Sequence, residues 1–228
     1  MARAGTLAVM MVAALAIGGS RAEAVVLAPG ATVPVAAASI AFPGGTQLNS
    51  VYYPNQTLVD TKVTLRSAVY RNAGGTLDFY YQVTNNSPVP PADILSELNA
   101  SSFGAFTTDV YWVVNGAAIA CSACSDTGTF LTGSQEPETA DRSPSGSVVA
   151  FNFPTATFGI DPGETSYVLL IRTNATVYKP GFMSTINSGT ITRAAFAPDI
   201  FVPEPASLTL LGIGLFGTGV AMRRKRNI

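Results

Sequence analysis

The chain has 228 residues, of which only 12% are charged, whereas about 25% is usual in globular proteins. It contains no histidine, which excludes His-based catalytic triads and His-ligated metal sites. Its net charge is −1 at pH 7, but six of the 13 basic residues lie near the two ends. Between positions 25 and 202 there are seven basic and 12 acidic residues, so the middle of the chain is mildly acidic. An acidic middle is unsuited to binding nucleic acid.

The amino-terminal segment has the three parts of a secretory signal peptide. A basic start is followed by an apolar run from 6 to 19, which is too short for a comfortable membrane span. Ala22 and Ala24 then form a small-x-small cleavage site. We therefore expect export by the secretion machinery, with cleavage after Ala24 and Val25 as the first mature residue. A buried helix of the following domain is the alternative.

Alternating apolar and polar residues indicate strands through the first half of the middle. The run 25–39 is apolar and broken by proline, which suits a lead-in with a first strand. Residues 61–71 and 76–84 both alternate with a period of two, and the sequence Asn-Ala-Gly-Gly at 72–75 separates them. These two runs predict a β-hairpin.

Further short strands are predicted after the hairpin. The segment 93–100 is ambiguous, because Ile94 and Leu98 have helical spacing in a run that is too short for a helix of ordinary length. Other strand-like runs lie at 105–114, 147–153, 160–173 and 186–198. About eight strands and no long helix predict an all-β fold, a single antiparallel β-sandwich, with a small barrel as the alternative.

Cys121 and Cys124 are the only cysteines, and they form a Cys-x-x-Cys pair. Redox catalysis of the thioredoxin type needs such a pair at a helix N-terminus in an α/β fold, and metal binding would need two more soft ligands. In an oxidising envelope we expect a local disulfide, with free thiols as the alternative. We expect no metal and no cofactor.

Two other groups of side chains have possible functions. The stretch 125–142 contains four acids, which predicts a solvated surface loop, with Ca²⁺ binding or acid catalysis as alternatives. The acids are Asp126, Glu136, Glu138 and Asp141. A set of aromatic residues suits a sugar-stacking platform, although burial in the core is the more ordinary outcome for Tyr80 and Trp112, which lie on predicted strands. This set is Tyr52, Tyr53, Tyr70, Tyr80 and Trp112.

Four Asn-x-Ser/Thr sequons suggest exposed turns along the middle of the chain. They begin at Asn55, Asn85, Asn99 and Asn174.

The end of the chain joins an extended segment, an apolar run and a basic cluster. Pro203 and Pro205 favour extended conformations at Val202 and Glu204. The run 206–222 has no charge, and as a helix it would be about 26 Å long, against roughly 30 Å for a hydrocarbon core. Four cations follow, which should stay in the cytoplasm and argue against the alternative of a core helix. They are Arg223, Arg224, Lys225 and Arg226.

This three-part ending resembles the PEP-CTERM sorting signal of exported bacterial proteins. That signal consists of a Val-Pro-Glu-Pro motif, here at residues 202–205, a short hydrophobic helix and an Arg-rich end. The resemblance implies recognition by an exosortase, a multi-pass membrane cysteine transpeptidase, and processing near residues 203–205. It also implies a Gram-negative host and a transient anchor in the inner membrane. A permanent single-span anchor is the alternative for the helix.

The sequence thus predicts three parts, a signal peptide at 1–24, a β-sandwich at 25–202 and a sorting signal with a transmembrane helix at 203–228. We expect an exported envelope or extracellular-matrix protein that is not an enzyme. It would be tethered to the inner membrane before processing and reach the cell surface or the medium afterwards. The alternative function is a carbohydrate-binding module for exopolysaccharide.

Overall fold

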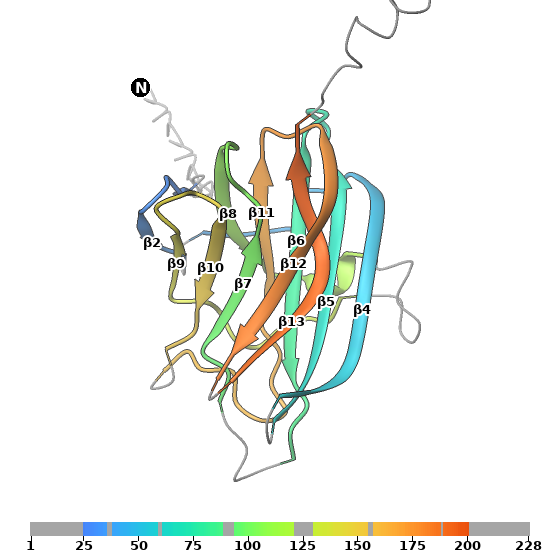
Figure 1. The fold of residues 1–228 in the computed structure, drawn as a ribbon. Coiled ribbons are helices and arrows are strands. Elements are labelled where there is room, and N and C mark those ends of the chain that lie inside the picture. The colour runs from blue at the N-terminus through green and yellow to red at the C-terminus, as the bar shows by residue number, and fades with distance from the viewer. Residues whose placement is uncertain are drawn as a thin grey trace, which may run out of the picture.

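The computed structural model describes residues 25–35, 38–58, 61–88, 94–120, 130–154, 157–187 and 189–200. These residues form an all-β body of two sheets (Figure 1). The strand pairs are antiparallel except for β3 with β8. Thirteen strands lie within the described residues, more than the eight or so that the sequence indicates. Among the same residues, no helix has the length and apolar character that a membrane span requires.

The first sheet has the strand order β1-β8-β11-β6-β5-β4, with β3 also paired to β8. Its strands are β1 (Val25–Val26), β3 (Ser39–Ile40), β4 (Thr46–Leu58), β5 (Thr61–Arg71), β6 (Leu77–Asn85), β8 (Thr108–Val113) and β11 (Val168–Thr173). The predicted hairpin is confirmed as β5 and β6, with Arg71 opposite Leu77 across the turn. The Asn72 side chain closes this turn, because its Oδ1 accepts hydrogen bonds from the backbone N–H groups of Gly74 and Thr76.

The second sheet has the order β13-β12-β7-β10-β9-β2. Its strands are β2 (Thr32–Pro34), β7 (Glu97–Ser101), β9 (Thr139–Arg142), β10 (Val148–Asn152), β12 (Val177–Ile186) and β13 (Thr190–Asp199). The ambiguous segment 93–100 is therefore mostly strand, since β7 lies between β10 and β12. The proline-broken lead-in supplies three short strands where one was expected.

The core lies between the inner faces of the two sheets. Phe79 and Tyr81 alternate with Tyr80 and Gln82 along β6, so that the first two point towards the second sheet. The Tyr81 hydroxyl donates a hydrogen bond of 2.6 Å to the backbone carbonyl of Phe196 in β13. The two sheets therefore pack face to face, as expected for a β-sandwich.

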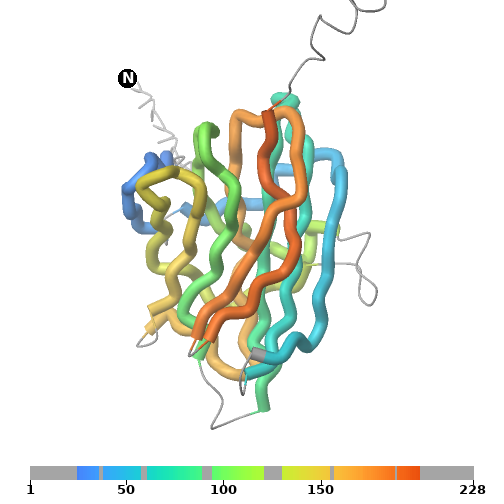
Figure 2. The backbone as a smooth tube through the Cα atoms, viewed as in Figure 1, coloured from blue at the N-terminus to red at the C-terminus, as the bar shows by residue number. Residues whose placement is uncertain are grey.

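The outer face of the first sheet is covered as well. Tyr80 and Gln82 are fully buried although they point away from the second sheet. Phe42 packs edge-on against Tyr80. It belongs to the segment that carries the chain from β3 to β4, which lies at the opposite edge of the sheet (Figure 2). Leu131 exchanges hydrogen bonds with the Gln82 amide from a second covering segment. Side chains on both faces of β6 are therefore removed from solvent.

Candidate functional site

The last described strand and several loops meet at one end of the body. Thr173 at the end of β11 and Val177 at the start of β12 are separated by three residues, so these strand ends lie together. Val177 is paired with Asp199 at the end of β13 (Figure 1). We call this part of the body the terminal end. It comprises residues 25–29, 72–76, 102–107, 174–176 and 198–200.

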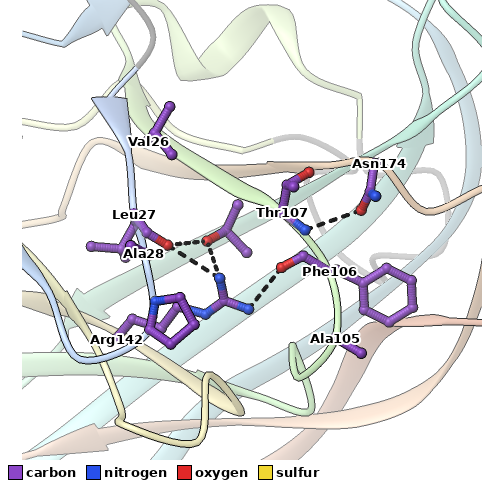
Figure 3. Close-up of a pocket in the computed structure, with 10 residues that line it drawn as sticks. Val26, Leu27, Ala28, Ala105, Phe106, Thr107, Arg142 and Asn174 are labelled. Carbon is purple, nitrogen blue, oxygen red and sulfur yellow. Dashed lines mark hydrogen bonds between the residues drawn. The ribbon is translucent and has the colours of Figure 1, made fainter.

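A pocket of about 420 Å³ opens at the terminal end (Figure 3). Its walls come from residues 26–29 after β1, from the turn before β8, and from Asn174. The Asn174 side-chain oxygen accepts a hydrogen bond of 3.1 Å from the backbone N–H of Thr107, which joins two of these walls. Arg142 of β9 lies against this pocket.

Arg142 is 4% exposed, and its guanidinium makes five hydrogen bonds, one for each of its N–H donors. The acceptors are the backbone carbonyls of Leu27 (3.1 Å), Phe103 (2.8 Å), Phe106 (2.8 Å) and Gly146 (2.9 Å) and the Thr108 hydroxyl (3.1 Å). All five acceptors are neutral, and burial lowers the pKa of Arg142. Because the donors are already used, Arg142 holds the turn and the β1 segment in place and has no donor left for a ligand.

A second charged group lies on the outer face of the first sheet near the same end. Asp78 is fully buried, and Arg172 donates two hydrogen bonds to its carboxylate, at 3.1 and 3.2 Å. Asn72 donates a third, of 2.8 Å. The Arg172 guanidinium also lies 5.4 Å from the centre of the Tyr111 ring. The carboxylate and its partners form a satisfied structural cluster, with nothing that marks Asp78 as a reactive acid.

Asp109 borders this cluster at the start of β8. Burial raises its pKa, and the nearby positive charge of Arg172 opposes that rise. Burial is the larger of the two effects. The carboxylate of Asp109 is thus less favourable in the folded protein than in water.

The predicted acidic loop is partly wrong, because its last four residues form β9. Glu138 is exposed, Glu136 is partly exposed, and Asp141 accepts a hydrogen bond of 2.8 Å from Asn152. Asp126 lies outside the described residues. Within the described part of the chain, no group of three or more Asp, Glu, His or Cys residues is placed to hold a metal ion.

The five aromatic residues do not form one exposed platform. Tyr70, Tyr80 and Trp112 are buried, with exposures of 3%, 0% and 8%. Tyr52 and Tyr53 are partly exposed, but as neighbours on β4 they point to opposite faces. The Arg66 guanidinium lies 5.1 Å from the centre of the Tyr52 ring. The burial of Tyr80 and Trp112 agrees with their position on predicted strands, whereas the burial of Tyr70 depends partly on Phe42 in a segment that covers the outer face.

The sequons are not all exposed turns. Asn55 and Asn174 are exposed, as expected. Asn85 is fully buried at the end of β6, where its side chain donates a hydrogen bond of 3.0 Å to the Ile160 carbonyl. Asn99 lies within β7 and pairs with Ala150 and Ser184. The prediction was therefore wrong for these last two.

Other predicted site residues lie outside the described part of the chain. They are the cleavage-site residues Ala22 and Ala24, the pair Cys121 and Cys124, the segment 202–205, the apolar run 206–222 and the cations 223–226. Ile200 is the last described residue before that segment.

Comparison with known families identifies this ending. A model described as the PEP-CTERM protein-sorting motif matches residues 201–226. The chain carries a PEP-CTERM sorting motif. The motif marks an exported protein that an exosortase sorts at a membrane. Neither the search of curated proteins nor the search of solved structures found a match.

The PEP-CTERM motif follows the body almost without a linker. β13 ends at Asp199, and the matched region starts at residue 201. Asp199 is fixed by its pairing with Val177 and by an ion pair with Lys179, with 3.2 Å between Nζ and Oδ1. The sorting signal therefore leaves directly from the terminal end.

Proposed function

We propose that this protein is a non-enzymatic component of the cell envelope or extracellular matrix that reaches its place as an exosortase substrate. The signal peptide at 1–24 would direct export, and the helix at 206–222 would hold the precursor in the inner membrane. The exosortase would then process the tail near Pro203, Glu204 and Pro205. The two-sheet body would be released or attached at the surface of a Gram-negative cell.

The observation that carries this proposal is the sorting motif placed directly after the last strand. A motif that follows a complete β body leaves that body intact when the tail is removed. The basic cluster at 223–226 supports the same topology, because it should remain cytoplasmic and leave the body outside the inner membrane.

We place an envelope or matrix role ahead of carbohydrate binding. Three of the five rings that suggested a sugar platform are buried, so that platform gives no support to exopolysaccharide recognition. An enzymatic role is also not proposed. Among the described acids of the stretch 125–142, Asp141 lies in β9 and is bonded to Asn152, and Glu136 and Glu138 are partly or fully exposed. The buried Asp78 carboxylate is satisfied by Arg172 and Asn72.

The proposal is tested by following the carboxyl terminus in the native cells. Mass spectrometry of the protein from the parent strain should find a carboxyl terminus near residues 203–205, and an exosortase deletion should leave the tail intact. A variant with Glu204→Ala and both flanking prolines changed to alanine should behave like the deletion. A double change to alanine at Thr190 and Thr192, which are exposed on β13, is the control and should be processed. The same full-length terminus in both strains would defeat the proposal.

A further inference from the structure

We propose that the exosortase docks against the terminal end of the body, because the chain between β13 and the sorting motif is too short for any other approach. This inference rests on the sorting function proposed above. It adds the surface of the body that the enzyme contacts and the reason for that choice.

The length of the tether is the first step. Asp199 ends β13, and Pro203 is four residues later. Four extended residues span at most about 14 Å. β12 and β13 have ten residues each, which corresponds to about 33 Å along the body. An enzyme that holds residues 203–205 therefore works within reach of the terminal end and far from the opposite one.

The tether cannot easily gain length from the body. β13 is paired with β12 along all ten residues, up to Asp199 opposite Val177. The end of this β12–β13 pairing is also held by the hydrogen bond from Tyr81 to the Phe196 carbonyl and by the Lys179–Asp199 ion pair. Unpairing the end of β13 would expose the backbone of Phe196 and Ala197, which are 6% and 0% exposed. The folded body therefore fixes the point from which the tail leaves.

The chemistry of the terminal end suits a protein partner. Val26 and Ile200 are large apolar side chains with exposures of 65% and 61%. Three basic side chains border the terminal end, and each has partners within the body. Arg172 pairs with Asp78, Lys179 pairs with Asp199, and Arg71 donates to the carbonyls of Gly75 and Thr176. Anionic lipid headgroups attract clusters of free cations, which this arrangement does not offer. Exposed apolar side chains and already paired cations therefore favour the exosortase, and not the lipid surface, as the partner of the terminal end.

Photocrosslinking in the native cells tests this inference. A photoreactive amino acid replaces Thr176, which is exposed at the terminal end, in the full-length precursor. The matched control places it at Asp161, which is exposed beside Gly163, whose N–H binds the Asn85 carbonyl at the opposite end of β6. We expect an adduct with a tagged exosortase when the photoreactive residue is at position 176, and no such adduct when it is at position 161. Equal adducts from both positions, or an adduct with lipid in place of the exosortase at position 176, would overturn the inference.

A linker variant tests the cause. Twelve Gly and Ser residues inserted between Ile200 and Phe201 add roughly 20 Å of mean reach. The tail should still be processed, and the adduct from position 176 should fall. An adduct of unchanged strength would contradict the role of the short tether. If the tail is processed but position 176 gives no adduct, this inference fails alone, whereas an unprocessed tail in the parent strain defeats the sorting function itself.

Discussion

Arg142 and Asp78 show two different ways of burying a charge in one protein. Asp78 has a cationic partner in Arg172, and the pair is bidentate. Arg142 has four carbonyls and one hydroxyl as acceptors, so its positive charge is stabilised by dipoles alone. Its acceptors come from three segments of the chain, at Leu27, at 103–108 and at Gly146, so one guanidinium joins all three.

Replacing Arg142 by lysine tests this arrangement. A lysine keeps the charge but has three donors on one nitrogen, so it cannot reach five acceptors spread around a planar guanidinium. We expect Arg142→Lys to lower the free energy of unfolding by about 3 kcal/mol, measured by urea denaturation. Arg193→Lys is the matched control, because Arg193 is partly exposed and donates to Gln56, and it should cost under about 1 kcal/mol. Equal losses would contradict a special role for Arg142.

Asp109 should lower the free energy of unfolding in a way that depends on pH. Because burial raises its pKa in the folded state, folding favours the protonated form, and stability falls as the pH rises through the folded pKa. Asp109→Asn should therefore be more stable than the parent at pH 7. The difference should vanish below about pH 4, where the carboxyl is protonated in both states. Urea titrations from acidic to neutral pH measure this, and a difference that does not change with pH would contradict it.

At the scale of elements, β4 and β12 are the long strands that sequence alternation did not reveal. β4 is interrupted by register shifts after Gln47 and after Tyr53, so the alternation of inward and outward side chains along it is broken twice. β12 contains Pro180 and Gly181, which disfavour strand interiors. Pro180 is tolerated because β7 pairs with β12 only from Met183 onwards, which leaves one neighbouring strand at the proline.

Gly181 is required by the close approach of β13. A Cβ atom added at Gly181 would lie 2.6 Å from the Cβ of Ala197 and 3.2 Å from its backbone nitrogen. We expect Gly181→Ala to lower the free energy of unfolding by about 2 kcal/mol, although alanine suits a strand better than glycine does. Thermal or urea unfolding measures the loss. Adding Ala197→Gly should restore part of it, and a double variant no more stable than Gly181→Ala would show that another contact is responsible.

At the scale of the whole molecule, two sheets and two covering segments form one body, and the sorting motif leaves from one end of it. Tyr81 links the sheets directly, because its buried hydroxyl on β6 reaches the Phe196 carbonyl on β13. Burial raises the pKa of Tyr81, so it remains protonated and able to donate across the ordinary pH range. This bond joins the middle of the first sheet to the strand that carries the sorting tail.

Removing the Tyr81 hydroxyl tests the link between the sheets. Tyr81→Phe keeps the ring and should lower the free energy of unfolding by about 1 kcal/mol, because one buried hydrogen bond is lost. Tyr178→Phe, in a half-buried ring that packs on Phe196 from the outer face, is the control and should change stability less. Urea denaturation compares the two. If both variants lose the same amount, the hydroxyl of Tyr81 does not couple the sheets.

The sequence by itself determined the features that are written in contiguous residues. The β5–β6 hairpin follows from two alternating runs around Asn72, and the sorting motif follows from the order of prolines, apolar residues and cations after residue 201. The all-β class follows in the same way from short alternating runs and the absence of a long helical pattern. Each of these depends on interactions between near neighbours, which spacing along the chain expresses directly.

Only the tertiary structure decided what lies on which surface. Tyr70 was a candidate for an exposed sugar platform and Asn85 for an exposed turn, yet both are buried by segments distant in the chain. The acceptors around Arg142 and the position of β13 at the terminal end likewise come from long-range pairing. Burial and hydrogen-bond partners are properties of segments brought together in space, so no local pattern of residues could specify them.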